Sequence, residues 1–179
     1  MNTFLPEGAQ EPKAKSNYTM PLAEGSVKFR VMSPAIVGFE GWGEKEGKPS
    51  PIRWTTQDAP PFGPDGKEPK YFWAFIIWNY ELEQLQIMAI TQKTVRRAME
   101  AYVSNDAWGD PKRYDMVITR KGTKIEDTEY TVVANPHSDV APEIKEAYEK
   151  STISLEEWRK GNDPFEKEIP EVVPNLDNF

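Results

Sequence analysis

The chain has 179 residues, a net charge of −7, one histidine and no cysteine. This length fits one domain with extensions better than two domains. The lack of cysteine excludes disulfide bonds, a cysteine nucleophile and cysteine zinc sites, and it suits a reducing cytoplasm. The single histidine excludes a histidine-rich metal site, so we expect neither a metal nor a cofactor.

The first residues do not show the basic and then apolar pattern of a signal peptide. The longest apolar run, residues 71–78, is far shorter than the ~20 residues that cross a bilayer as a helix. We therefore expect a soluble protein of the host cytoplasm with no membrane partner.

Acidic side chains are concentrated at the end of the chain. Residues 141–179 hold 10 of the 29 acidic side chains but 5 of the 22 basic ones. This distribution is typical of an acidic interaction tail, and residues 1–140 are close to neutral. The overall negative charge therefore does not exclude a surface that binds phosphates on the first part of the chain.

The first predicted strand follows a flexible arm. Residues 1–24 are polar and interrupted by proline, so we expect them to be flexible. Residues 28–32 alternate basic and apolar side chains, which places Lys28 and Arg30 on the face away from the core. Pro34 interrupts the strand, and residues 36–39 continue it after a bend.

A long loop and a hairpin are expected next. Residues 41–70 are rich in glycine and proline and predict a loop. Residues 71–80 are aromatic and β-branched and predict a strand, and residues 85–90 complete a hairpin with it. Two faces are possible for the first of these strands, and we favour the one that turns Tyr71 and Trp73 outward.

A helix separates these strands from two more. Residues 91–104 carry an apolar stripe at helical spacing, with Thr91 as the expected N-cap and Lys93, Arg96 and Arg97 on the other faces. Residues 114–120 and 129–134 predict two further strands. Three strands, a helix and two strands form the order of an OB-fold, a mainly β, five-stranded Greek-key barrel with its helix between strands three and four.

Three regions are therefore expected after the N-terminal arm. Residues 25–140 form the OB-fold domain, and residues 141–161 form a short helical extension. In this extension Ser154 begins a capping box and Gly161 ends the helix. Residues 162–179 form an acidic, disordered tail.

Basic and aromatic residues alternate along the predicted domain, as they do in proteins that bind single-stranded nucleic acid. Such proteins stack bases on aromatic rings and hold phosphates with cations. The candidate phosphate contacts are Lys28, Arg30, Arg53, Lys70, Lys112, Arg120 and Lys121, and the candidate stacking residues are Trp42, Trp54, Tyr71, Trp73 and Tyr114. The alternative interpretation is that the aromatic strands are core and the cations are solvated surface.

The end of the chain carries a terminal aromatic residue on an acidic segment. Its candidate contact residues are Glu166, Glu168, Glu171, Asp177 and Phe179. Such a segment can dock in a basic pocket of a partner, or it can lie in the protein's own cationic groove until nucleic acid displaces it. The alternative is an ordinary disordered terminus.

Several segments together resemble the core of bacteriophage single-stranded DNA-binding proteins. They are YTMPLAEGSVKFRV (18–31), GFEGW (38–42), YFWAFIIWNY (71–80), ITQK (90–93) and YDMVITRKG (114–122). The resemblance covers residues 18–134, and the tail is similar to those of phage T7-type and bacterial single-strand binders. It implies an OB-fold, sequence-independent binding of single-stranded DNA in phage replication, recombination or repair, and a tail that recruits partner proteins.

The chain also departs from one branch of this family. It lacks the cysteines of the T4-type zinc site, and the basic N-terminal arm that supports cooperative binding there is not evident. Self-association therefore stays an open alternative.

Two other functions are weighed against DNA binding. An enzyme is not expected, because alternation and turns explain Asp110, Asp115 and Glu126 without catalysis, and His137 lies in a polar loop. A protein-interaction module that inhibits or adapts a host or phage enzyme remains the alternative, which the acidic net charge would suit. Salt-sensitive binding to an oligonucleotide separates this alternative from DNA binding, because phosphate contacts release counterions.

Overall fold

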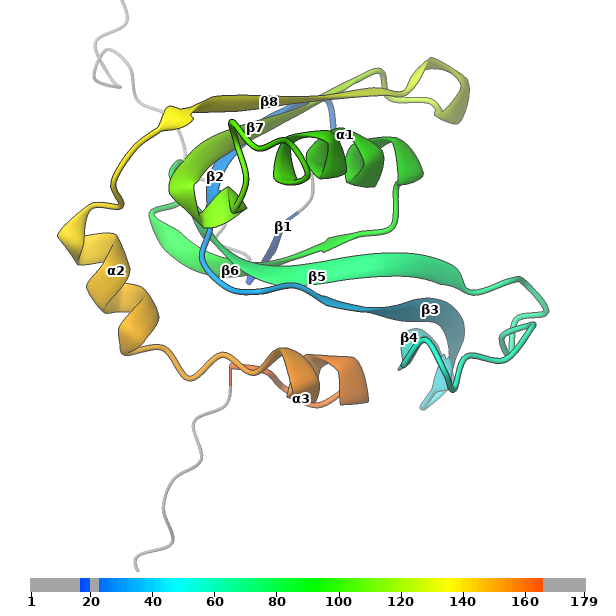
Figure 1. The fold of residues 1–179 in the computed structure, drawn as a ribbon. Coiled ribbons are helices and arrows are strands. Elements are labelled where there is room, and N and C mark those ends of the chain that lie inside the picture. Colours follow the sequence, from blue (N-terminus) through cyan, green and yellow to red (C-terminus); the bar gives the residue numbers. More distant parts are fainter. Residues whose placement is uncertain (1–16, 20–22, 166–179) are drawn as a thin grey trace, which may run out of the picture.

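The computed structural model describes residues 17–19 and 23–165 (Figure 1). The strands are β1 (Tyr18–Thr19), β2 (Gly25–Val31), β3 (Ile36–Lys45), β4 (Lys48–Trp54), β5 (Lys70–Asn79), β6 (Gln84–Ile90), β7 (Tyr114–Lys121) and β8 (Glu129–His137). The helices are α1 (Lys93–Val103), α2 (Pro142–Glu149) and α3 (Leu155–Lys160), with 3-10 turns η1 (Pro111–Arg113) and η2 (Ile125–Asp127). The expectation of a mainly β fold is confirmed.

The described strands form one sheet in the order β1-β6-β5-β2-β7-β8, and β3 adds to β5 and carries β4. The pairs are antiparallel except β1 with β6, which is parallel. Within the described residues the pairing does not join β6 to β8, so the sheet is open.

A bend at Pro34 separates β2 from β3, and both of these strands pair with the same long strand, β5. Val31 of β2 lies opposite Ile77, and Ile36 of β3 lies opposite Ala74 of the same strand, β5. Proline has no N–H to donate to the sheet. At the bend the Ile76 N–H of β5 therefore leaves the regular backbone pairing and donates to the hydroxyl of Ser33 at 2.9 Å. The bend expected from the sequence is therefore confirmed.

The segment predicted as a loop is in large part a hairpin, so that prediction is wrong. β4 pairs along its whole length with β3, from Phe39 opposite Trp54 to Lys45 opposite Lys48. Glu46 and Gly47 join them with positive φ at both residues, 53° and 75°, which a type I′ hairpin turn requires. The irregular connection is confined to residues 55–69.

The main core lies between the sheet and α1. α1 lies between β5 and the β7–β8 pair in Figure 1. Val95 and Met99 of this helix are buried against Phe75, Ile77 and strand residues from β2, β6 and β7. α1 begins at Lys93 and its N-cap is Gln92, so the prediction of Thr91 as the cap is wrong by one residue.

The opposite face of the sheet is covered by the C-terminal helices, and α3 lies on the far side of β5 from α1 in Figure 1. Trp158 of α3 is buried against Phe72, with ring centroids 5.3 Å apart in an edge-to-face arrangement. The Ser154 cap is confirmed, because its hydroxyl accepts the Glu157 N–H, and Gly161 ends α3 in the left-handed conformation. Both faces of β5 are therefore packed.

Candidate functional site

Four half-buried aromatic side chains lie on one face of β3, β4 and β5. Phe39 lies opposite both Trp54 and Tyr71, and Val37 lies opposite Trp73. Partners directly across a sheet project from the same face. We call Phe39, Trp54, Tyr71 and Trp73 the aromatic row. The ring centroids of Phe39 and Tyr71 are 5.5 Å apart, which makes this surface continuous.

The aromatic row continues the face of β5 that enters the core. Side chains alternate along a strand, so Tyr71 and Trp73 share a face with Phe75 and Ile77. Phe75 and Ile77 are buried beneath α1. Trp73 is half-buried and packs against this core, and Tyr71 is half-buried against Arg96 of α1. The preference for an outward face at Tyr71 and Trp73 is therefore only partly right.

A glycine in β3 makes room for the ring of Trp54. A Cβ at Gly41 would lie 2.9 Å from Cζ3 of Trp54 and 3.0 Å from Cη2. Real Cβ atoms are not found at such distances from a ring that cannot move, so Gly41 lets the indole lie against the strand. Gly63 of the connecting segment approaches the same ring.

α1 adds a cation to the aromatic row. The guanidinium carbon of Arg96 lies 4.8 Å from the centroid of the Tyr71 ring, a cation–π contact. The Nε atom of Arg96 is buried and has no hydrogen-bond partner among the described residues. Lys93 and Arg97 are exposed on the same helix. This end of the row therefore combines ring surface with positive charge.

An apolar pocket of about 390 Å³ lies beside the row. Its apolar walls include Val31, Val37, Trp73, Phe75, Met99 and Val103, and Asp110 and Lys112 lie at its polar side. Val37 and Val103 are 42% and 40% exposed, so the pocket opens to solvent. Its volume falls within the ~300–1,000 Å³ typical of small-ligand sites. Trp73 belongs both to this pocket and to the aromatic row.

Arg30 is not a surface cation, and its prediction as a phosphate contact is wrong. Its side chain is 1% exposed, and its Nε donates to Oδ1 of Asp115 at 2.6 Å. Its other nitrogens donate to the carbonyls of Lys112 and Ser138 and to the Ser138 hydroxyl. A buried arginine needs such partners, and here they engage all three nitrogens of the guanidinium.

The carboxylate of Asp115 also contacts two other side chains, those of Tyr80 and Lys28. It accepts the hydroxyl of Tyr80 at 2.7 Å, and Lys28 Nζ lies 4.0 Å from its second oxygen. Burial, and then the hydrogen bond to this carboxylate, raises the pKa of Tyr80 to about 12. Lys28 also lies over the Tyr80 ring, 5.0 Å from its centroid. This cluster joins β2, β7 and the residue that follows β5, and it holds these segments together.

Two further predicted residues have structural roles. Arg53 forms an ion pair with Glu40 at 2.8 Å, lies 3.7 Å from the centroid of the Trp158 ring and donates to the Trp158 carbonyl. It holds α3 on the face opposite the aromatic row. Tyr114 is 0% exposed and stacks on His137, so its prediction as a stacking residue for a base is wrong.

The remaining predicted residues do not gather at the row. Trp42 is 48% exposed but projects from the opposite face of β3, since it is an odd number of residues from Phe39. Lys70 and Lys121 are exposed, and Arg120 at the end of β7 is half-buried near Thr128 and Tyr130. The predicted tail residues Glu166, Glu168, Glu171, Asp177 and Phe179 lie outside the described residues.

The structure thus brings together Trp54, Tyr71 and Trp73 from the predicted set, with Lys112 at the far side of the apolar pocket. The sequence interpretation missed Phe39 as a row residue and Arg96 as its cation. Helical spacing places Arg96 beside Val95 on α1, but only the packing of α1 on β5 brings it to Tyr71.

The described residues hold neither a membrane-spanning helix nor a cluster of metal ligands. No helix among residues 17–19 and 23–165 is long and apolar enough to cross a membrane. The same residues contain no group of three or more His, Asp or Glu side chains placed to hold a metal ion.

Comparison of the chain with protein-family models and with curated proteins gives no match. The case for a function therefore rests on the aromatic row, Arg96 and the apolar pocket.

Proposed function

We propose that the protein binds single-stranded DNA without sequence specificity and that the aromatic row receives the bases. The observation that carries this proposal is the convergence of Trp54, Tyr71 and Trp73 on one face beside the Arg96 guanidinium. Each stacked base contributes about 1–3 kcal/mol in proteins of this kind. Stacking of this type is tolerant of sequence, because every base has a flat face.

The positive charges near the aromatic row are suited to contact the phosphates of a single DNA strand. Arg96 and the exposed Lys93 and Arg97 project from α1, and Lys112 lies at the other side of the apolar pocket. A bound strand would place its phosphates near these cations while its bases contact the rings. Bases paired in a duplex do not offer their faces, so duplex DNA should bind weakly.

The order of the strands along the chain, and their pairing, support a more specific description of this mainly β fold as an OB-type fold. The bent β2–β3 unit would be its first strand, followed by β5, β6, α1, β7 and β8. This unit pairs with both β5 and β7, and β7 pairs with β8, as a Greek-key barrel requires. OB-folds are often partly open, which accommodates the missing β6–β8 pairing and the contact of α1 with β8 instead.

The resemblance to phage single-strand binders supports a role in DNA replication, recombination or repair, with the acidic tail recruiting partners. The tail should be tested with a variant that ends at Phe165, since α3 packs on the sheet through Trp158. Tighter DNA binding by that variant is the expected result if the tail competes with DNA for the cations.

A second candidate is a protein-interaction module, which the apolar lining of the pocket favours. An apolar side chain of a partner could fill that pocket without any phosphate contact. Fluorescence anisotropy of labelled single- and double-stranded oligonucleotides separates the two functions. Salt-sensitive binding to the single strand supports DNA binding. If neither oligonucleotide binds at low salt, the DNA proposal fails and the protein-interaction module replaces it.

A further inference from the structure

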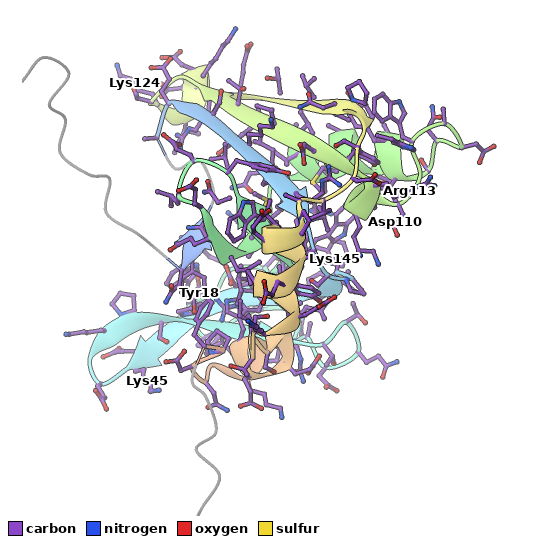
Figure 2. All side chains as sticks on the ribbon, turned by 90° about the vertical axis from the view of Figure 1, so that its left-hand side faces the viewer. Tyr18, Lys45, Asp110, Arg113, Lys124 and Lys145 are labelled. Atoms are coloured by element: carbon purple, nitrogen blue, oxygen red, sulfur yellow. The ribbon has the colours of Figure 1, made fainter. Side chains whose placement is uncertain are left out.

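A second pocket, of about 460 Å³, adjoins η1. Its lining includes Lys112, Arg113, Ser138, Asp139 and Lys145, with Arg30 behind them. We call it the cationic pocket. Lys112 lines both this pocket and the apolar pocket beside Trp73, so the two are neighbours. Figure 2 labels two of its cations, Arg113 at the end of η1 and Lys145 on α2.

The cationic pocket has an excess of unneutralised positive charge. Asp139 is the one carboxylate in its lining, and Lys112 lies 3.6 Å from Asp110 outside it. Arg113 and Lys145 are exposed, and neither forms an ion pair within the described part of the chain. In contrast, the basic residues of α3 and Lys150, the C-cap of α2, pair with glutamates of the same helices.

Arg30 holds the two walls of this pocket in place. Its Nη1 donates to the carbonyl of Lys112 at 3.1 Å on one wall and to the carbonyl of Ser138 at 2.9 Å on the other. The Ser138 N–H also donates to the carbonyl of Arg113 at 3.0 Å. The backbone that carries Arg113 is therefore fixed before any ligand binds, which lowers the entropy cost of binding.

We propose that the cationic pocket binds the phosphate of a nucleotide whose base enters the adjoining apolar pocket against Trp73. Arginine and lysine are the side chains that bind phosphate most often, and Arg113 and Lys145 supply one of each. The apolar pocket supplies the flat ring and the aliphatic walls that suit a base. This inference rests on the proposed DNA-binding function and identifies one nucleotide subsite within it.

The salt dependence of oligonucleotide binding tests the subsite. For single strands the slope of log K against log salt changes by about 0.7 for each phosphate contact. The double variant Arg113→Ala/Lys145→Ala should therefore lower the magnitude of the slope by about 1.4 relative to the full-length wild type. The matched control, Lys124→Ala/Lys150→Ala, removes two exposed cations outside the pocket and should leave the slope unchanged. The charge-retaining variant Arg113→Lys/Lys145→Arg should restore it.

A second readout separates failure of the subsite from failure of DNA binding. Inorganic phosphate and thymidine monophosphate, titrated into the full chain, should shift the backbone amide NMR signals of residues 112–113 and 138–139. Thymidine without phosphate should shift signals at the apolar pocket alone, and the double variant should lose the phosphate response.

The outcomes are distinct. Suppose that the oligonucleotide binds, that the double variant keeps the wild-type salt slope, and that phosphate shifts no NMR signal. The subsite is then overturned and the proposed function stands. If phosphate and the nucleotide bind in the pocket but no oligonucleotide does, the subsite stands and the proposed function fails. If nothing binds, both are overturned.

Discussion

The guanidinium of Arg96 lies over the ring of Tyr71, with 4.8 Å between its central carbon and the ring centroid. This contact joins α1 to β5 and places a positive charge at the aromatic row. It also explains why a charged residue lies next to the apolar stripe of α1, beside the buried Val95.

The first prediction concerns this cation. Arg96→Ala should weaken binding of a single-stranded oligonucleotide and lower the magnitude of its salt slope by about 0.7, the value for one phosphate contact. The change should leave the fold intact, because Arg96 makes no ion pair among the described residues. Anisotropy titrations over a range of salt measure both effects. An unchanged slope would show that Arg96 serves only to pack on Tyr71.

The second prediction concerns the space beneath Trp54. Gly41→Ala adds a Cβ that would lie 2.9 Å from the indole, so the ring must leave its place on β3. We expect a changed near-ultraviolet circular dichroism spectrum and weaker oligonucleotide binding. Gly43→Ala is the matched control, because its Cβ meets the flexible end of Ile52 instead of a ring. Equal effects of both substitutions would mean that β3 itself is disturbed and that Trp54 has no special part.

The third prediction concerns the buried ion pair. Asp115→Ala leaves the guanidinium of Arg30 buried without its carboxylate, which costs about 3–5 kcal/mol. For a chain of this size the midpoint of thermal unfolding should fall by roughly 6–20 °C. The exposed pair of Lys150 and Glu146 is the control, and Glu146→Ala should change stability by less than about 1 kcal/mol. Thermal melts followed by circular dichroism compare the two. A small loss at Asp115 would show that water reaches Arg30.

The fourth prediction follows from the pKa of Tyr80, which is raised from its ordinary value of 10.0 to about 12. Because the folded state favours the protonated phenol, this contribution to stability is fully present below the ordinary pKa. It is lost as the pH rises toward 12. Tyrosine ionisation followed by NMR should find Tyr80 still protonated when exposed tyrosines have ionised. If Tyr80 ionises together with them, its hydrogen bond to Asp115 does not persist in solution.

Much of the secondary structure could be predicted from the sequence, because its signals are local. The period of two in β2 and the apolar stripe of α1 each arise within about ten residues. The β3–β4 hairpin was missed, because its glycines and prolines resemble a loop and its pairing becomes visible only across the turn at Gly47.

The site was harder to predict because it depends on what covers each strand face. Alternation correctly places Arg30 opposite Phe29 and Val31, but it cannot reveal Asp115, which lies 85 residues along the chain and buries that face. Tyr114 has the composition of a stacking residue, yet Trp108 and His137 enclose it. Trp54, Tyr71 and Trp73 were identified by residue type alone, and only the register of β3, β4 and β5 shows that they share a surface.

The central claim is that the aromatic row receives the bases of single-stranded DNA, and a pair of tryptophan variants tests it most directly. Affinity for a labelled single-stranded oligonucleotide would be measured for the wild type, for Trp73→Ala in the row and for Trp42→Ala on the opposite face. Loss of one stacked base should weaken binding by Trp73→Ala about 5- to 150-fold, while Trp42→Ala binds like the wild type. Equal affinities for Trp73→Ala and the wild type, or a loss confined to Trp42→Ala, would contradict the assignment of the row as the DNA site.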